Sequence, residues 1–185
     1  MQAVVIDLDG TLLDTAADLA AAVNAMLVQL GRAPLSLAKV AEYVGKGAEI
    51  LVHRALTDSP EGRAPQPQFE SAYRAFLEHY RRENGRQARP YPGVLEGLRA
   101  MRAQGLRLAG VTNMSSGYPG PLLQQCGLAG FFELVVSGDT LVRKKPDPLP
   151  MLHACEHLGL PPARVLGIGD SLNDAIAARA AGMPV

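Results

Sequence analysis

Four short apolar runs stand out along the chain, at residues 3–6, 106–111, 133–136 and 164–168. Each run is mostly aliphatic and continuous, whereas a strand with one wet face would alternate apolar and polar positions. Continuous runs of this length are typical of strands that are buried on both faces of a parallel sheet. The pattern therefore predicts four parallel strands covered by helices.

Amphipathic segments precede two of these runs. Residues 94–104 carry Leu95, Leu98 and Met101 at helical spacing, and Gly105 follows as a helix stop. Residues 149–158 repeat the pattern and end at Gly159. The alternation of strand and helix predicts an α/β protein with an open, Rossmann-like parallel sheet.

The stretch between the first and second runs contains no segment with the pattern of a strand. It holds four predicted helices, at residues 15–30, 37–44, 48–56 and 69–83, with a polar stretch rich in proline and glycine at 58–67. A crossover between parallel strands needs only about a dozen residues. The surplus predicts an inserted small α-helical domain. We assign residues 14–89 to this insert, and residues 1–13 and 90–185 to the α/β core domain.

Composition narrows the class of protein. The 185 residues include 18 Lys+Arg and 18 Asp+Glu, and this zero net charge argues against an electrostatic grip on nucleic acid or on an anionic membrane. No apolar stretch approaches the ~20 residues that cross a bilayer, and the N-terminus has no basic leader. Two distant cysteines, Cys126 and Cys155, fit reduced thiols. We expect a soluble cytoplasmic protein, monomeric or homodimeric, without nucleic acid or membrane partners.

Asp7 and Asp9 directly follow the first run. Residues i and i+2 of an extended chain point the same way, so both carboxylates lie at the carboxyl end of the strand, where open α/β sheets bind ligands. Gly10 permits a tight turn there. Two neighbouring carboxylates repel each other, and a bound cation is the usual compensation. The alternative for an isolated Asp-x-Asp is a solvated acidic turn.

The other predicted strands also end in chemically useful residues. Thr112 and Asn113 follow the second run, Lys145 lies in a basic stretch after the third, and Asp170 and Asp174 follow the fourth. Mg²⁺ is held by a few carboxylates together with water and substrate oxygens. Phosphoryl oxygens need lysine, hydroxyl or amide donors. The four strand ends together predict a site for Mg²⁺ and a phosphate group.

Four motifs, in this order, resemble those of the haloacid dehalogenase-like superfamily. They are Asp-Leu-Asp-Gly-Thr-Leu from residue 7, Thr-Asn from 112, Lys-Pro from 145 and Gly-Asp-Ser-Leu-Asn-Asp from 169. Within the superfamily the chain most resembles phosphoglycolate phosphatases, from residue 1 to about 182. The resemblance implies that the helical insert is the small cap that closes over the active site of this family.

The resemblance also implies catalytic roles. Asp7 is expected to attack phosphorus and form an aspartyl-phosphate, and Asp9 to serve first as the acid for the leaving group and then as the base for water. Lys145 is expected to neutralise charge on Asp7 and on the transferring group. A solvated surface position is the alternative for any lysine in a basic run, but Pro146 matches the motif and favours the functional reading of Lys145.

The binding roles implied by the resemblance fall to the remaining motif residues. The expected Mg²⁺ ligands are the Asp7 carboxylate, the Asp9 backbone carbonyl and the Asp170 carboxylate. Asp174 would orient these ligands without coordinating the ion itself. Thr112 and Asn113 would hydrogen-bond the phosphoryl oxygens.

The insert contains one candidate binding segment, Gly45-Lys46-Gly47, between two predicted helices. Gly45 and Lys46 could present backbone amides and a cation to a substrate carboxylate. The alternative is a simple turn between helices.

Two features depart from the family pattern. Residues 114–121 contain two glycines and two prolines, which resist a helix interior, so we expect the next helix to start late, with Pro119 or Pro121 in its first turn. The chain stops at Val185, where family members continue with another strand. By analogy the sheet order would be 5-4-1-2-3, so we expect the last edge strand to be missing and the fourth strand to form an edge.

The sequence thus predicts a Mg²⁺-dependent phosphatase that hydrolyses a small phosphomonoester, with 2-phosphoglycolate as the first substrate. One alternative is another phosphate substrate, such as a sugar phosphate, a nucleotide or pyrophosphate. A second is a phosphomutase, and a third is a catalytically inactive binding module with the same fold. Dehalogenation fits less well, because the acids at 9, 170 and 174 suit Mg²⁺ and phosphate.

Overall fold

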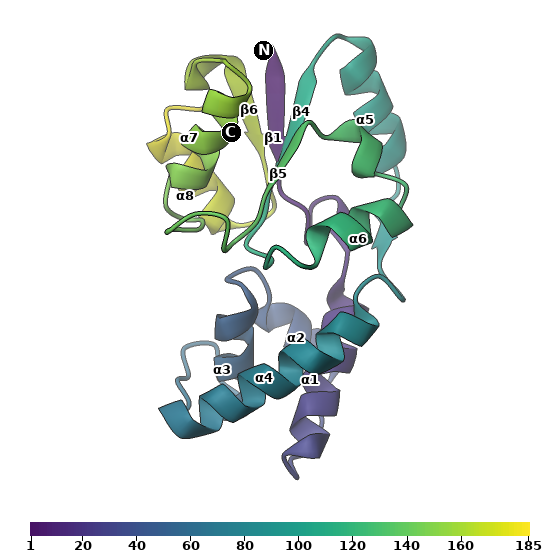
Figure 1. The fold of residues 1–185 in the computed structure, drawn as a ribbon, viewed down its shortest axis with the longest axis vertical. Helices are drawn as coiled ribbons and strands as arrows, with labels where there is room; N and C mark the ends of the chain where they lie inside the picture. Colours follow the sequence, from purple (N-terminus) through teal and green to yellow (C-terminus); the bar gives the residue numbers. More distant parts are fainter. The chain divides into compact units, whose positions relative to one another are not determined.

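The computed structural model describes residues 1–185, which divide into two compact units. The α/β unit consists of Met1–Asp14 and Arg89–Val185, and the helical unit consists of Thr15–Ala88 (Figure 1). The boundaries predicted from the sequence lie one residue away on each side. The reason is a short antiparallel ribbon, β2 (Leu13–Asp14) and β3 (Arg89–Pro90), which pairs Asp14 with Arg89 and keeps both in the α/β unit. A two-residue strand leaves no hydrophobic pattern from which to predict it.

All four predicted strands form one parallel sheet. Its order is β5 (Leu134–Val136), β4 (Arg107–Val111), β1 (Ala3–Ile6) and β6 (Val165–Ile168). In the central register, Ala3 lies opposite Arg107 on one side and Val165 on the other. Every residue of β1 is buried, as its continuous apolar run predicts.

Helices cover both faces of this sheet. They are α5 (Val94–Ala103), α6 (Pro119–Gln125), α7 (Leu149–His157) and α8 (Leu172–Ala180), with 3₁₀ turns at Ala129–Phe131 and Pro162–Arg164. Figure 1 shows α7 and α8 on one side of the sheet and α5 on the other. Val5 of β1 lies in the same buried cluster as Met151 of α7 and Ala177 of α8. The Rossmann-like α/β fold class is therefore confirmed.

Two details of the α/β unit follow the sequence expectations. α6 starts at Pro119, eight residues after β4 ends, and Pro121 also lies in its first turn. Proline lacks a backbone N–H, but in the first turn of a helix this group has no intrahelical partner, so no hydrogen bond is lost. β6 lies at one edge of the sheet, and the Gly167 backbone N–H donates to the Pro184 carbonyl at 2.8 Å.

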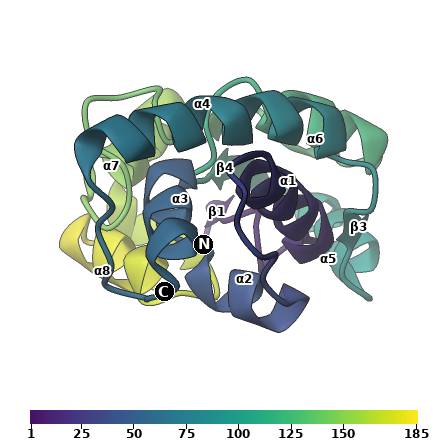
Figure 2. The ribbon, with the colours of Figure 1, turned by 90° about the horizontal axis from the view of Figure 1, so that it is seen from below.

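The helical unit consists of α1 (Ala16–Gln29), α2 (Leu37–Tyr43), α3 (Ala48–Thr57) and α4 (Gln66–Glu83). α1 packs mainly against α4, which runs alongside it (Figure 2). α4 begins three residues earlier than predicted, because Pro67 occupies its first turn, where proline is tolerated. No helix in the chain has both the length and the apolar character needed to cross a membrane.

A buried carboxylate fastens the end of the helical unit to its first helix. Asp18 of α1 is 1% exposed. Its Oδ1 accepts a hydrogen bond from the Gln87 N–H at 2.8 Å, and its Oδ2 accepts from Gly85 at 2.7 Å and from Ala88 at 3.2 Å. Three backbone donors therefore compensate the charge, and the segment that leads into β3 is held against α1.

Candidate active site

Asp7 lies where β1 ends, in the middle of the sheet. Its backbone N–H donates to the Ile168 carbonyl at 2.9 Å, which extends the β1–β6 ladder by one bond. Its Oδ1 accepts from the Leu8 N–H at 2.7 Å and lies 2.9 Å from Lys145 Nζ. The side chain is only 12% exposed. The carboxylate is thus fixed in direction and faces a cation.

Lys145 projects from the loop after β5 into the centre of the site. Its Nζ lies 2.6 Å from the Val111 carbonyl, 2.6 Å from Asp174 Oδ1 and 2.9 Å from Asp7 Oδ1, so all three donors are used. The side chain is 2% exposed. By contrast, Arg143 in the same loop is 71% exposed and pairs with Asp147 at the surface. Lys145 is therefore a buried site residue and not a solvated lysine.

Asp174 lies in the first turn of α8, where it closes a capping box with Ser171. Its Oδ2 accepts from the Ser171 N–H at 3.1 Å and from Ser171 Oγ at 2.5 Å, while its Oδ1 binds Lys145. Both oxygens are thus engaged within the protein. This suits a residue that holds Lys145 in place better than one that gives an oxygen to a cation.

Three carboxylates form the cluster that could hold a metal ion. Asp7, Asp170 and Asp174 each offer an oxygen, and these oxygens lie within 4.8 Å of one another. Asp170 is exposed, and its Oδ1 accepts from Thr11 Oγ1 at 2.8 Å. Because Asp174 is engaged elsewhere, Asp7 and Asp170 are the carboxylates best able to bind a cation, and oxygen ligands of this kind suit Mg²⁺.

Asp9 lies next to this cluster but does not belong to it. After Leu8 the chain turns sharply, with hydrogen bonds from the Leu12 and Leu13 N–H groups to the Leu8 carbonyl at 2.9 and 3.0 Å. Gly10 has a φ of +80°, and a Cβ there would lie 2.5 Å from Asp170 Oδ2. The turn requires glycine for both reasons, and Asp9 lies within it, beyond the end of β1.

The surroundings of Asp7 change its acidity strongly. The pKa of its carboxyl group is raised from 3.8 to about 7, mainly by burial and further by the charges of Asp174 and Asp9, although Lys145 opposes the shift. A metal-free site would therefore contain both protonated and ionised Asp7 near neutral pH. A bound cation would reverse this preference, because it favours the ionised carboxylate.

Thr112 and Asn113 lie at the end of β4, as predicted, and they make different contacts. Thr112 is buried, and its Oγ1 accepts from the Met114 N–H at 3.1 Å, so its hydroxyl proton can be donated to a phosphoryl oxygen. The Asn113 side chain instead donates from Nδ2 to the Lys145 carbonyl at 3.0 Å. That contact holds the Lys145 loop, a use of the side chain that its sequence position did not indicate.

Gly45 and Lys46 belong to the helical unit, in the turn between α2 and α3. Gly45 has a φ of +105° and Gly47 a φ of +86°, so this turn needs glycine at both positions. Lys46 between them is exposed. The segment begins α3, because the Gly47 carbonyl accepts from the Leu51 N–H at 3.1 Å.

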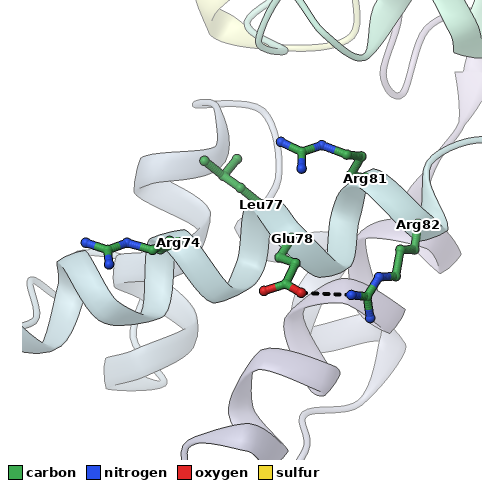
Figure 3. Close-up of a pocket in the computed structure, with 5 residues that line it drawn as sticks. All are labelled: Arg74, Leu77, Glu78, Arg81 and Arg82. Carbon is green, nitrogen blue, oxygen red and sulfur yellow. Dashed lines mark hydrogen bonds and ion pairs between the residues drawn. The ribbon is translucent and has the colours of Figure 1, made fainter.

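The helical unit also carries a hollow that holds none of the predicted site residues. It has a volume of about 460 Å³ and is lined by Arg74, Leu77, Glu78, Arg81 and Arg82 of α4 (Figure 3). Glu78 pairs with Arg82 at 2.8 Å, and Figure 3 shows Leu77 and Arg81 on the other side of the helix. One helix alone lines the hollow, so it is a shallow surface feature.

Tyr91 is a site neighbour that the sequence pattern did not reveal. Its backbone N–H donates to the Leu12 carbonyl at 3.1 Å, which continues the β2–β3 ribbon. Burial and the charges of Asp14, Asp170 and Asp9 raise the pKa of its phenol. The ring therefore lies near the acids of the site. Only the unpredicted ribbon brings it there.

Comparisons with known proteins give one family. The family described as "Hydrolase: haloacid dehalogenase-like hydrolase" matches residues 1–182. The phosphoglycolate phosphatase of Thiobacillus denitrificans is 50% identical over 185 residues, which are 100% of this chain and 82% of that protein.

Solved structures agree with this result. The crystal structure of a predicted phosphoglycolate phosphatase from Haemophilus somnus has a TM-score of 0.91 and 34% identity, and the match covers 99% of this chain and 83% of that one. A mutant of CbbY from Rhodobacter sphaeroides, in complex with xylulose-(1,5)bisphosphate, has a TM-score of 0.79 and 26% identity, with 99% and 84% of the two chains covered.

Proposed function

The chain belongs to the haloacid dehalogenase-like hydrolase family and is a phosphoric monoester hydrolase, and on that premise we propose that it hydrolyses 2-phosphoglycolate with the help of Mg²⁺. The observation that carries this proposal is the buried lysine of the site: Lys145 Nζ lies 2.9 Å from Asp7 and 2.6 Å from Asp174. A nucleophilic carboxylate beside a fixed cation is what phosphoryl transfer to an aspartate requires.

We propose that Asp7, Asp170 and the Asp9 backbone carbonyl bind the Mg²⁺ ion. The donor set supports this, because the clustered carboxylates outnumber the one buried lysine and repel each other without a further cation. When bound, the ion would supply positive charge that stabilises the phosphoryl oxygens. Asp174 would act indirectly, by holding Lys145 in place.

In the proposed reaction, the Asp7 carboxylate attacks phosphorus and displaces the alcohol, so that an aspartyl-phosphate forms on Asp7. Asp9 gives its proton to the departing alkoxide and then takes a proton from the water that hydrolyses this intermediate. Lys145 remains a fixed cation beside the attacking carboxylate throughout. The Thr112 hydroxyl donates to a phosphoryl oxygen and so helps to align the group for attack.

The experiment that tests this function measures phosphate release from 2-phosphoglycolate and a panel of other phosphomonoesters, with Mg²⁺ or with EDTA. We expect release from 2-phosphoglycolate to be fastest and to stop in EDTA. Sugar phosphates test the main alternative, since the solved structure of CbbY contains a sugar bisphosphate. Isomerisation of a sugar phosphate without release of inorganic phosphate would instead indicate a phosphomutase.

Substrate selection is the proposed task of the helical unit. A Lys46 ammonium beside the Gly45 and Gly47 amides suits a carboxylate, and 2-phosphoglycolate carries one. The change Lys46→Met should raise the KM for 2-phosphoglycolate and leave the KM for ethyl phosphate, which lacks a carboxylate, unchanged. Equal effects on both substrates, or none, would leave the segment as a turn between helices.

The proposed partners are therefore small phosphorylated metabolites. The zero net charge offers no electrostatic attraction to nucleic acid or to anionic lipid, which supports a freely diffusing protein. We propose the cytoplasm as its location, with a monomer or a homodimer as the active form.

A further inference from the structure

An exposed carboxylate joins the loops that follow β4 and β5. Asp139 lies after β5, and its Oδ1 accepts from the Ser116 N–H at 2.8 Å. Its Oδ2 accepts from Ser116 Oγ at 3.3 Å. We propose that Asp139 is a positioning residue for Thr112, the residue proposed to bind the phosphoryl group, an inference that rests on the proposed function.

Two backbone hydrogen bonds support the same pair of loops. The Thr112 N–H donates to the Val136 carbonyl at 2.9 Å, and the Gly138 N–H donates to the Met114 carbonyl at 2.8 Å. The hydrogen bond from the Ser116 N–H to Asp139 is a third bond between the same two loops. The segment from 112 to 116 is thus held at three points by the segment from 136 to 139.

The two loops also touch without any space between them. A Cβ on Gly138 would lie 2.4 Å from the Asn113 carbonyl oxygen, closer than any real contact. Glycine at 138 therefore allows the close approach on which the other contacts depend. A displacement of one loop would displace the other.

Asp139 is itself held in position by a tight turn. The Thr140 N–H donates to the Ser137 carbonyl at 3.1 Å, and the Thr140 hydroxyl accepts from the Ser137 N–H at 2.9 Å. The carboxylate is therefore presented by a preformed turn, so little conformational entropy is lost when it binds Ser116.

The sequence after Asn113 explains why such support is needed. α6 begins only at Pro119, so the residues from Met114 to Tyr118 have no helix to fix them. The Thr112 hydroxyl accepts from the Met114 N–H, so its direction depends on where Met114 lies. Asp139 fixes Ser116, the bond from Gly138 fixes Met114, and Thr112 is aligned as a result.

The negative charge of Asp139 distinguishes a positioning role from direct binding of phosphate. A carboxylate does not attract a phosphate dianion, so the benefit must come from its two hydrogen bonds. Asparagine keeps an acceptor for the Ser116 N–H and loses the charge, whereas alanine loses both acceptors. The two substitutions therefore have different expected outcomes.

The test compares Asp139→Ala with Asp139→Asn, and with Glu156→Ala, which removes an exposed carboxylate elsewhere in the α/β unit. The readouts are KM and kcat for 2-phosphoglycolate, the Kd of inorganic phosphate in the presence of Mg²⁺ by calorimetry, and the Tm. We expect Asp139→Ala to raise KM and Kd in parallel by about tenfold, the equivalent of one hydrogen bond. Asp139→Asn and Glu156→Ala should stay within about twofold of the unchanged protein.

Two results would overturn the inference. A lower Tm of Asp139→Ala with unchanged KM and Kd would show that Asp139 has only a structural role. An equal rise in KM and Kd in Asp139→Asn and Asp139→Ala would show that the charge, and not the hydrogen bonds, is responsible. The Kd separates this proposal from the proposed function, because phosphate binding does not require turnover. A chain that binds phosphate in the expected manner but hydrolyses nothing would refute the function and leave the positioning role supported.

Discussion

Lys145 and Asp174 form an almost completely buried ion pair, with Nζ 2.6 Å from Oδ1 and the side chains 2% and 3% exposed. Such a pair is stable only where further hydrogen bonds satisfy both charges. Here Lys145 also donates to the Val111 carbonyl, and Asp174 also accepts from Ser171. The pair joins the loop after β5 to the start of α8 and thereby holds the ammonium group beside Asp7.

Removal of this ammonium group should abolish both its electrostatic and its structural contribution. Lys145→Met leaves Asp7 and Asp174 facing each other without the cation between them. We expect kcat/KM to fall by about 100-fold or more, and the free energy of unfolding to fall by about 3–5 kcal/mol. Phosphate release and urea unfolding measure the two effects. Arg143→Met, at an exposed surface pair in the same loop, should change neither; equal losses in both variants would contradict the assignment.

The position of Asp174 depends on a glycine five residues earlier. A Cβ on Gly169 would lie 2.3 Å from Asp174 Cγ, so Gly169→Ala must displace this carboxylate. Because Asp174 holds Lys145, we expect activity to fall by about 100-fold. Gly97→Ala is the matched control, since a Cβ at that position in α5 meets nothing within 4 Å. It should be neutral or stabilising by up to about 1 kcal/mol. Full activity of Gly169→Ala would show that Asp174 is dispensable.

The pKa of Asp7 predicts how stability depends on pH in the absence of metal. Its folded-state pKa of about 7 exceeds the ordinary 3.8, so the folded protein binds this proton more tightly than the unfolded chain. The free energy of unfolding should therefore fall as pH rises from about 4 to about 7. Asp7→Asn should lack this part of the pH dependence, measured by urea unfolding in EDTA.

Parallel pH profiles of the two proteins would contradict the raised pKa. The same proton must leave before a cation can bind, so the affinity for Mg²⁺ should increase with pH up to about 7. Calorimetric titration of Mg²⁺ at several pH values measures this effect without any need for turnover.

Asp18 should matter for the stability of the helical unit. Asp18→Ala leaves the N–H groups of Gly85, Gln87 and Ala88 without their acceptor. We expect the free energy of unfolding to fall by about 3 kcal/mol, and the amide hydrogens of residues 85–88 to exchange faster. Glu42→Ala, at an exposed position on α2, should stay within about 0.5 kcal/mol. Similar values for the two variants would rule out a special role for Asp18.

The strands were predictable because a buried parallel strand leaves a continuous apolar run. Asp7, Thr112 and Asp170 were predictable for a related reason: parallel strands place their carboxyl ends at one edge of the sheet. When three apolar runs are each followed directly by an acidic or hydroxyl side chain, the sequence already indicates one shared site. The resemblance to a known family added the roles, which geometry alone does not give.

The contacts that fix the site could not be predicted in the same way. The bond from Asn113 to the Lys145 carbonyl joins residues 32 positions apart, and it depends on loop conformations that have no periodic pattern. The contact between Ser116 and Asp139 is of the same kind. Tyr91 reaches the acids only through a two-residue ribbon. Tertiary structure, and not local preference, determines all three.

Phosphate release from 2-phosphoglycolate with Mg²⁺, compared between the unchanged chain and Asp7→Asn, tests the central claim most directly. Asparagine keeps the shape of the side chain and removes the proposed nucleophile, so a matching Tm would establish that the variant is folded. We predict rapid release by the unchanged chain and a rate at least about 1,000-fold lower in the variant. Comparable release by both proteins would contradict the proposed role of Asp7 as the nucleophile.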